Sequence, residues 1–439
     1  MNKVKHRAMS ALLIAALVLV GLGVYIVRYL ENGAKWATFA VGGYTSGVVS
    51  MGTIVDRNGV VLANADGSSR TYADDWSVRR ACYHAVGDYA GNVGTGALSS
   101  FAAQLAGYNP ITGTYARGGR EVKLTLDSRL CVVAQEALAG RKGAVLLSNY
   151  RTGEILCMTS NPTTDPADSS AKIADGTYLN RCISVSYTPG SVFKLITSAA
   201  AIENIPDLAQ QTFTCWGSVD VAGVTINCTG SHGEQTFEEA LANSCNVAFA
   251  NISLQLGGDT LERYVYDYGF TRMHQLDEIT TAGGSFTKDN PGTPGLAWSG
   301  IGQSTDLICP YSMLRFVAAI ANDGVLVEPK LIDDGQPAEH SLLVNPDTAK
   351  TMQELMRNNV IQTYGDNRFP GLEVCGKTGT AEVGDGTDHA WFTGFLKDPD
   401  HPYAFIVFVE QGGGGLSVAT PIANTVLQAA MRRGTDMEY

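Results

Sequence analysis

The sequence predicts a mixed α/β fold of the α+β kind, in which strands from the two ends of the main domain meet in one sheet. Two strand-like segments come early, in GAVLLSNYRTGEILCMTS, and three come late, in EVCGKTGTAEV, AWFTGFL and YAFIVFVE. Helical patterns such as TFEEALANSCNVAFANISLQLG and YSMLRFVAAIAN fill the interval. Because the strands and helices of one domain pack as layers around a shared core, this order indicates one sheet whose first and last segments are neighbours.

Length, composition and charge limit the classes of function. The chain has 439 residues, of which 45% are hydrophobic, so it can bury one large domain and a smaller one. Its formal net charge of −12 argues against a nucleic-acid partner, which favours a basic protein face. The sequence has no HExxH, P-loop or Rossmann glycine pattern, so it predicts no metal and no nucleotide or other cofactor.

The N-terminus predicts an uncleaved membrane anchor. Three basic residues, Lys3, Lys5 and Arg7, precede an uncharged run of 17 residues at 11–27 that ends at Arg28. This run is near the lower length limit for a membrane span, and the residues after it offer no convincing Ala-x-Ala cleavage site. Basic residues before a span favour a cytoplasmic N-terminus, so the chain after the span is expected outside the cell.

These signals and the change of composition along the chain divide it into four parts. Residues 1–10 are predicted to be cytoplasmic, and residues 11–28 are predicted to form a transmembrane signal-anchor. Residues 29–120, rich in Gly, Ala, Ser and Tyr, form a small module in which Asn-Gly at 58–59 signals a hairpin turn. Residues 121–439 form the main domain, which opens with a strand, an aspartate cap and a helix.

The chain contains nine cysteines, an odd number, and none of them forms a Cys-x-x-Cys pair. This pattern disfavours a zinc ribbon or a thioredoxin-type site, and most of the cysteines are interpreted as small buried hydrophobic residues. Cys215 and Cys228 flank a strand-like hairpin. Outside the cell a disulfide between them is one hypothesis, with two free thiols as the alternative.

The segment YTPGSVFKLITSAAAIEN, residues 187–204, begins as a loop and continues as a helix. Thr-Pro-Gly is a start signal, and the apolar residues that follow recur at helical spacing. Ser191 and Lys194 lie three residues apart and can touch on one helix face. A lysine amine beside a hydroxyl is either a stabilised polar pair or a nucleophile with its base. A second Ser-x-x-Lys, at 169–172, lies in a stretch rich in Pro, Asp and Ser that is typical of a solvated loop.

Two further short motifs favour the nucleophile over the polar pair. Ser-x-Asn occurs at 244–246, within a helix predicted over 236–256, and Lys-Thr-Gly occurs at 377–379, within a strand predicted over 372–383. Each triplet is weak evidence alone. In the order Ser-x-x-Lys, Ser-x-Asn, Lys-Thr-Gly, the three together are strong evidence for a catalytic site.

With these motifs the sequence resembles the penicillin-binding proteins, the serine D,D-transpeptidases that crosslink bacterial cell wall. The resemblance rests on the strings YTPGSVFK, ALANSCNVAF, GKTGTAE and HAWFTGF, and it spans roughly residues 50–430. Thr188 departs from the family pattern, which has a glutamate there. VDRNGVVLA and GIGQSTDLICPYSMLRFVAAIANDG resemble the monofunctional, class B branch, and the short segment before the main domain resembles its compact Gram-positive type A members. The resemblance implies a serine transpeptidase/β-lactamase-like fold, with a central, mostly antiparallel sheet flanked by helices and an N-terminal pedestal module.

The resemblance also implies roles for the site residues in acyl transfer from a D-Ala-D-Ala stem peptide. Ser191 is the nucleophile, and Lys194 accepts its proton as a neutral amine, a form that burial and a second cation favour. Lys377 supplies this cation, and Ser244 relays a proton to the departing D-alanine. Asn246 holds the acyl-donor backbone or the Lys194 side chain.

The remaining predicted substrate-binding residues are Thr378, Gly379 and Thr380. The two threonine hydroxyls would bind the terminal carboxylate of the stem peptide. The backbone N–H groups of Ser191 and Thr380 would form the oxyanion hole. The resemblance further implies a D-alanine carboxypeptidase side activity and covalent inhibition by penicillins.

Two alternatives stay open at this level. A β-lactamase shares all three motifs but needs a base for deacylation, and Glu239-x-x-x-Asn243 lacks the spacing of the class A glutamate. A β-lactam sensor or a non-catalytic scaffold is the second alternative, although only about ten residues precede the span to form a cytoplasmic effector. Cys245, His232 and His389 are interpreted as packing residues rather than as a nucleophile or bases.

The expected partners follow from the same resemblance. They are peptidoglycan stem peptides, β-lactam antibiotics, the membrane, and a membrane-embedded glycan polymerase of the shape, elongation, division and sporulation type, with no nucleic acid. A polymerase is expected because the chain leaves no room for a glycosyltransferase domain, and its contact is expected through the span and the membrane-proximal part of residues 31–120. The predicted localisation is the cell membrane, single-pass, with an extracellular catalytic domain.

Overall fold

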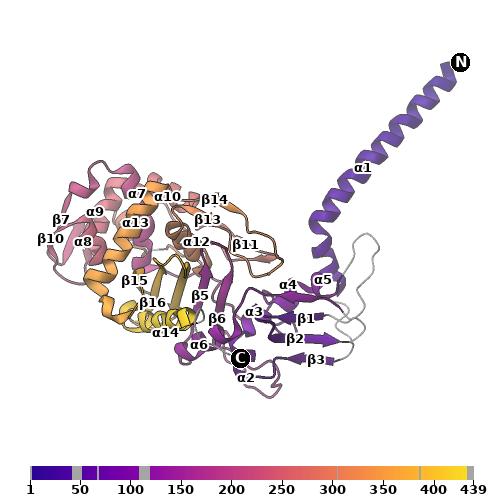
Figure 1. Cartoon of the computed structure of the whole chain (residues 1–439). Coiled ribbons are helices and arrows are strands. Elements are labelled where there is room, and N and C mark those ends of the chain that lie inside the picture. The colour runs from indigo at the N-terminus through magenta and orange to yellow at the C-terminus, as the bar shows by residue number, and fades with distance from the viewer. Residues whose placement is uncertain are drawn as a thin grey trace.

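The chain consists of a long N-terminal helix, a small sheet, and a larger sheet beside a lobe of helices (Figure 1). The computed structural model describes residues 2–41, 52–66, 69–107, 119–303, 305–384 and 387–432. Of the module predicted at 29–120, the stretches 42–51, 67–68 and 108–118 lie outside the described residues.

The first helix, α1 (Asn2–Val41), extends away from the rest of the protein (Figure 1). Its segment Val4–Leu30 is apolar and long enough to cross a membrane, and its side chains are not buried against the protein. The anchor predicted at 11–28 lies inside this segment. An apolar helical segment of this length that is not buried against the protein fits a membrane anchor.

A four-stranded sheet of order β3-β2-β1-β4 follows α1 along the chain. β1 (Gly52–Val55) and β2 (Val61–Asp66) form the antiparallel hairpin that the Asn-Gly dipeptide predicts. β3 (Ser69–Tyr72) pairs antiparallel with β2, whereas β4 (Glu121–Lys123) pairs parallel with β1. Four short helices lie between β3 and β4 in the chain: α2 (Trp76–Ala81), α3 (Tyr83–Val86), α4 (Ala97–Ser100) and α5 (Ala102–Leu105).

The main domain is built on a five-stranded antiparallel sheet of order β15-β16-β17-β5-β6. The late strand β17 pairs with the early strand β5, which confirms that the two ends of the domain meet in one sheet. The strands are β5 (Gly143–Asn149), β6 (Ile155–Asn161), β15 (Val374–Glu382), β16 (Asp388–Leu396) and β17 (Tyr403–Val409).

Helices cover this sheet, because β5, β6 and β17 are buried along almost their whole length. α6 (Ser128–Leu138) and α14 (Thr420–Met431) pack on each other and on the sheet. α12 (Pro310–Ala321) packs on β16 and β17. The predicted layered α/β architecture with a central antiparallel sheet is therefore confirmed.

A lobe of helices stands beside β15 (Figure 1). Its helices are α7 (Lys194–Asn204), α8 (Phe237–Ala242), α9 (Asn246–Leu256), α10 (Gly258–Asp267), α11 (Pro294–Ser299) and α13 (Pro346–Asn359). One-turn π-helices follow α13 and precede α14, namely η4 (Val360–Tyr364) and η6 (Gly415–Ala419).

The continuous helix predicted over 236–256 is wrong, because the segment forms two helices. A capping box at Thr236 and Glu239 begins α8, as the sequence TFEE favours. Between α8 and α9, Ser244 has a φ of 53°, a left-handed backbone conformation that no α-helix interior contains. The apolar periodicity runs through this break and therefore hides it from the sequence.

Short hairpins complete the fold around the lobe. β8 (Ser218–Val221) and β9 (Val224–Asn227) form the hairpin expected between Cys215 and Cys228. All nine cysteines lie in the described part of the chain and are free thiols, so the hypothesised Cys215–Cys228 disulfide is wrong. The other pairs are β7 (Thr212–Cys215) with β10 (Gly233–Thr236), β11 (Gln275–Leu276) with β12 (Ile279–Thr280), and β13 (Val325–Val327) with β14 (His340–Leu342).

Candidate active site

The serine of the first motif lies on a 3-10 turn, η2 (Gly190–Phe193), directly before α7. Gly190 has a φ of 54°, and its N–H donates to the Gly302 carbonyl oxygen at 2.9 Å. A Cβ atom at Gly190 would overlap the carbonyl oxygen of Thr380 on β15. The glycine before Ser191 is therefore required on two grounds, because it allows the left-handed backbone and lets the serine turn approach the third motif.

Lys194 is the first residue of α7, and its side chain is fully buried. Its Nζ lies 2.9 Å from Ser191 Oγ, 2.7 Å from Asn246 Oδ1 and 2.7 Å from the carbonyl oxygen of Ser244. A neutral amine has two N–H groups and one lone pair, so it can donate to the two carbonyl oxygens and accept from the Ser191 hydroxyl. Burial lowers the pKa of Lys194 well below its ordinary value, and the charge of Lys377 lowers it further. Geometry and charge thus both favour Lys194 as the proton acceptor.

Ser244 occupies the left-handed turn between α8 and α9. Its Oγ lies 3.1 Å from Lys194 Nζ and 2.9 Å from Lys377 Nζ. A hydroxyl is both donor and acceptor, so it can pass a hydrogen bond between the two amines. The same turn presents the carbonyl oxygen of Ser244 to Lys194. The break in the predicted helix therefore lets one residue contact Lys194 through both its backbone and its side chain.

Lys377 lies within β15 and is also fully buried. Besides Ser244 Oγ, its Nζ contacts the Thr378 carbonyl oxygen at 3.0 Å. Burial lowers the pKa of Lys377 to about 7. The charge of Lys377 adds to burial in lowering the pKa of Lys194, whereas burial alone lowers that of Lys377. A charged Lys377 therefore favours the neutral form of Lys194.

The rest of the third motif lies on β15, at the edge of the five-stranded sheet. Thr378 is half-buried and Thr380 is exposed, and Thr380 Oγ1 accepts a hydrogen bond from the Gly415 N–H at 3.4 Å. A Cβ atom at Gly379 would come within 3.0 Å of a Val192 methyl group on the serine turn. Gly379 therefore keeps β15 close to η2, and the two threonines are the members of this motif that remain accessible.

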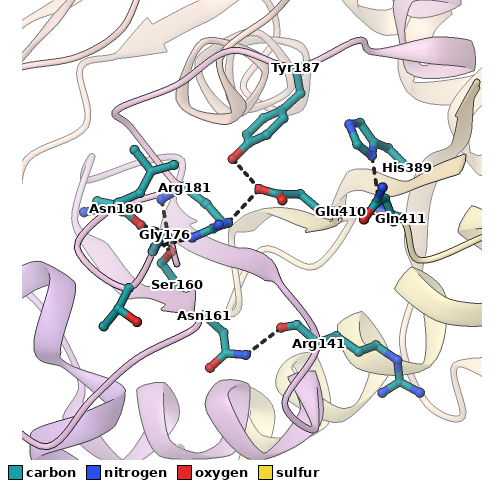
Figure 2. Close-up of polar contacts among 12 residues, drawn as sticks. Arg141, Ser160, Asn161, Gly176, Asn180, Arg181, Tyr187, His389, Glu410 and Gln411 are labelled. Carbon is teal, nitrogen blue, oxygen red and sulfur yellow. Dashed lines mark hydrogen bonds and ion pairs between the residues drawn. The ribbon is translucent and has the colours of Figure 1, made fainter. Parts of the chain in front are cut away.

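A polar cluster that no sequence pattern predicts lies behind the serine turn (Figure 2). Glu410 Oε1 accepts hydrogen bonds from Tyr187 Oη at 2.9 Å and from Arg181 Nε at 2.7 Å. The Arg181 side chain is almost fully buried and also donates to the Gly176 carbonyl oxygen at 2.9 Å. Tyr187 begins the YTPGSVFK string, so this buried ion pair fixes the approach to Ser191. The partners lie more than two hundred residues apart in sequence, and no local pattern marks them.

His389 lies beside this cluster and not in the catalytic group (Figure 2). Its Nδ1 accepts from the Gln411 N–H at 3.1 Å, and its ring meets the Tyr187 ring edge-on at 5.8 Å. These contacts agree with its interpretation as a packing residue.

Three cysteines and a histidine gather behind the second motif, and they are Cys215, Cys228, His232 and Cys245. The four potential ligand atoms all lie within 4.8 Å of one another. The sequence patterns predict no metal and favour packing roles for Cys245 and His232. Intervals of twelve, three and twelve residues separate the four side chains, and no short paired motif signals such a set.

The described residues thus bring all five predicted catalytic side chains into one hydrogen-bonded group around two buried amines. The geometry is that of an acyl-transfer site with a serine nucleophile and a lysine base. A family model described as "Penicillin binding protein transpeptidase domain" matches residues 143–428. The chain belongs to this family, the peptidoglycan D,D-transpeptidases, which are serine acyltransferases.

Individual relatives agree with the family assignment. The chain is 30% identical over 391 residues to the peptidoglycan D,D-transpeptidase PbpA of Mycolicibacterium smegmatis, covering 76% of this chain and 77% of the relative. Its fold is similar to the D,D-transpeptidase domain of a peptidoglycan glycosyltransferase from Eggerthella lenta, with a TM-score of 0.76, 26% identity, and coverage of 89% and 100%. Penicillin-binding protein 2 of Helicobacter pylori, solved in complex with MreC, shares the fold at a TM-score of 0.66 and 21% identity, with coverage of 73% and 66%.

These similarities confirm the predicted class B penicillin-binding protein resemblance, the fold class and the transpeptidase chemistry of the family. The roles assigned to single residues remain predictions. The apolar helix α1 fits a membrane anchor.

Proposed function

We propose that the chain crosslinks cell-wall stem peptides through an acyl-enzyme on Ser191, with Lys194 as the base. The observation that supports this most strongly is the fully buried Lys194 amine, 2.9 Å from Ser191 Oγ and close to a second buried amine on β15. A lysine acts as a base only when it is neutral, and burial next to a cation favours the neutral form.

In the first half-reaction Lys194 takes the proton of Ser191 while the serine oxygen attacks the carbonyl carbon of the penultimate D-alanine. The negative charge on the carbonyl oxygen is stabilised by the N–H groups of Ser191 and Thr380, an oxyanion hole in which each donor contributes roughly 3 to 4 kcal/mol in comparable enzymes. The peptide bond breaks, and the terminal D-alanine leaves as an amine after receiving a proton through Ser244. The ester on Ser191 conserves the energy of the broken bond, so no nucleotide is required.

In the second half-reaction the amine of another stem peptide attacks this ester. Lys194, neutral again once its proton has left with D-alanine, accepts a proton from the attacking amine and returns one to Ser191. Before the first half-reaction, the hydroxyls of Thr378 and Thr380, beside the Lys377 cation, bind the terminal carboxylate of the donor peptide, which later leaves with D-alanine. Water in place of the amine gives the carboxypeptidase side activity, and a β-lactam ring in place of the peptide gives a stable ester.

Ser191 is tested by mapping the site of penicillin attachment. Labelled penicillin should form an ester on the peptide containing residues 187–194, and Ser191→Ala should abolish it. Ser169→Ala, in the exposed second Ser-x-x-Lys copy, is the matched control and should label normally. An adduct on Ser169, Ser244 or Cys245 would remove Ser191 from the mechanism, and loss of the label within seconds would favour a β-lactamase.

The location and the partner are proposed on the same basis. Residues 1–10 would lie in the cytoplasm, α1 would cross the membrane once, and the pedestal at 29–120 would hold the domain at 121–439 outside the cell. A monofunctional transpeptidase needs glycan strands from another enzyme, which we propose to be a membrane-embedded polymerase. The Helicobacter pylori protein that shares this fold assembles with MreC, which supports a place in a membrane-bound complex.

Replacing residues 9–28 with an unrelated span of equal length tests this partner. Penicillin acylation should be unchanged, because the Ser191 site lies in the main domain. Co-purification with the polymerase and wall crosslinking in cells should be lost. If the protein with the replaced span still crosslinks the wall and still co-purifies with the polymerase, the span only attaches the protein to the membrane and does not recognise the polymerase.

A further inference from the structure

The cysteine and histidine cluster behind the second motif draws on four separate segments. Cys215 ends β7, Cys228 follows β9, His232 precedes β10, and Cys245 is the N-cap of α9. The ligand atoms lie within 4.8 Å of one another although 29 residues separate the first cysteine from the last. Three sulfurs and one imidazole nitrogen form a ligand set that structural zinc sites use.

Two of the distances between these side chains match the edges of a tetrahedron around one ion, and all four ligand atoms lie within 4.8 Å of one another. Zn–S bonds of about 2.3 Å in tetrahedral geometry place two sulfurs about 3.8 Å apart, and a Zn–N bond of about 2.0 to 2.1 Å places nitrogen about 3.5 to 3.6 Å from sulfur. Cys228 Sγ lies 3.8 Å from Cys245 Sγ and 3.6 Å from His232 Nδ1. We propose that Cys215, Cys228, His232 and Cys245 bind one zinc ion, which is structural and fixes the Ser244–Asn246 turn.

The hydrogen bonds around the sulfurs fit metal-bound thiolates. The Asn246 N–H donates to Cys228 Sγ at 3.2 Å, and the Ala248 N–H donates to Cys245 Sγ at 3.4 Å. Both donors belong to the first turn of α9, whose N-terminus favours negative charge. Zinc binding releases the thiol protons and compensates this charge, so the site suits three thiolates better than three neutral thiols.

Neither a disulfide nor apolar packing accounts for the whole cluster. A disulfide requires sulfurs about 2.05 Å apart, well below the Cys228–Cys245 separation of 3.8 Å, and it would leave Cys215 and the imidazole unused. Packing as small hydrophobic residues explains buried cysteines but gives no reason for a half-buried histidine to point its Nδ1 at Cys228. With four protein ligands the coordination is closed, which indicates a structural and not a hydrolytic ion.

The ion would affect catalysis by fixing the position of the Ser244–Asn246 turn. Cys245 is the residue between Ser244 and Asn246, and Cys228 accepts the backbone N–H of Asn246. The Asn246 side chain donates to the Asn227 carbonyl oxygen at 2.9 Å and accepts from Lys194 at 2.7 Å. Zinc bound to Cys228 and Cys245 therefore fixes the two segments between which Asn246 is held, and through Asn246 it fixes the contact with the Lys194 amine. The zinc ligands are positioning residues.

The test is the metal content of the full-length protein in detergent, measured after dialysis against metal-free buffer. We expect about one zinc per chain by elemental mass spectrometry, and less than about a tenth of that in Cys228→Ser and in His232→Ala. His232 is half-buried at the end of a loop, so its truncation leaves the fold intact. Cys131→Ala is the matched control, because it removes a buried thiol that contacts Cys82 and Cys157 in the other part of the domain, and it should keep the zinc.

Two further readouts separate the metal site from the proposed function. Cobalt(II) in place of zinc should give the thiolate charge-transfer and strong visible bands of tetrahedral coordination, and Cys228→Ser should remove them. Ser191→Ala should keep a full complement of zinc even though it cannot be acylated. Removal of zinc by a chelator should slow penicillin acylation by about tenfold to a hundredfold, as expected when a catalytic group is misplaced by about 1 Å, and added zinc should restore it.

The results that overturn the proposal are equally specific. They are protein with four intact ligands that contains no zinc and takes up none, zinc that persists unchanged in Cys228→Ser and His232→Ala, or zinc lost from Cys131→Ala alone. A Cys228–Cys245 disulfide in protein purified without reductant would also overturn it.

Discussion

The two halves of the active site are held together in different ways. Ser191 and Lys194 lie within one turn of η2 and α7, so the backbone of a single segment sets their separation. Ser244 and Cys245 lie between α8 and α9, Asn246 begins α9, and the three residues are held by Lys194, by Lys377 and by the segment that ends at Cys228. The first half is thus fixed locally, and the second depends on groups far away in the chain. Single substitutions and the pH dependence of acylation can test this contrast, from the largest expected effect to the smallest.

Lys194→Arg should be the most damaging change to the locally fixed half. Arginine keeps the charge but cannot supply a neutral nitrogen at ordinary pH, so acylation should fall by at least about a hundredfold. The measurement is the second-order rate of labelling by a fluorescent penicillin. Lys172→Arg, in the exposed second Ser-x-x-Lys copy, is the control and should react normally. Near-normal labelling of Lys194→Arg would exclude Lys194 as the base.

Asn246→Ala should break the support of the second half. The variant loses the 2.7 Å contact with Lys194 and the 2.9 Å bond to the Asn227 carbonyl oxygen. Hydrogen bonds to a group that becomes charged contribute about 1.5 to 3 kcal/mol, so acylation should fall by roughly tenfold to a hundredfold. Asn243→Ala, whose side chain bonds Gln235 instead, should stay close to the parent protein. Equal losses in the two variants would mean that any change in this turn disturbs the site.

The pH dependence of acylation tests how the two halves share protons. Lys194 must be neutral, so the rate should rise with pH through its lowered pKa. Lys377 must be charged, so the rate should fall as the pH passes its pKa of about 7. The expected profile is bell-shaped with its alkaline midpoint close to pH 7, and both limbs belong to the coupled pair. Lys377→Arg should lower the rate but lose the alkaline limb, because arginine stays charged.

A rate that keeps rising well above neutral pH in the parent protein would contradict the role of Lys377 as the cation. Acylation that does not depend on pH at all would contradict the proton-acceptor role of Lys194.

Tyr187→Phe should have the smallest effect, because the cluster behind the serine turn keeps its ion pair. The variant loses the hydroxyl bond to Glu410 while Arg181 remains 2.7 Å from the same oxygen. The free energy of unfolding should fall by about 1 kcal/mol, measured by denaturant titration, with acylation unchanged within about threefold. Tyr178→Phe, at an exposed tyrosine, is the control. A large loss of acylation in Tyr187→Phe would place this hydroxyl in the catalytic machinery.

The sequence predicted well what local patterns determine. The order of strands and helices predicted one sheet built from both ends of the domain, because alternation and periodicity are local properties. Ser191 and Lys194 were paired correctly because a helix turn fixes the distance between residues three apart. The three motifs in order predicted which side chains would meet.

What the sequence could not predict depends on contacts between distant segments. The helix break at Ser244 has an uninterrupted apolar pattern, and the left-handed residue is stabilised by Lys194 and Lys377 from other elements. The Arg181–Glu410 pair joins residues more than two hundred positions apart. The cysteine cluster depends on a β-hairpin that brings Cys215 and Cys228 to the start of α9, and no spacing rule contains that geometry.

The φ of 53° at Ser244 has a consequence for which residue can supply the hydroxyl between the two amines. Threonine offers the same hydroxyl and replaces serine harmlessly on many protein surfaces. Its β-branched side chain, however, fits the left-handed region poorly, whereas the residues that fit it best, such as glycine and asparagine, have no hydroxyl. Of the two aliphatic alcohols, serine alone both tolerates this backbone conformation and places a hydroxyl between the two amines. Even the conservative substitution Ser244→Thr is therefore disfavoured at this position by the main-chain conformation.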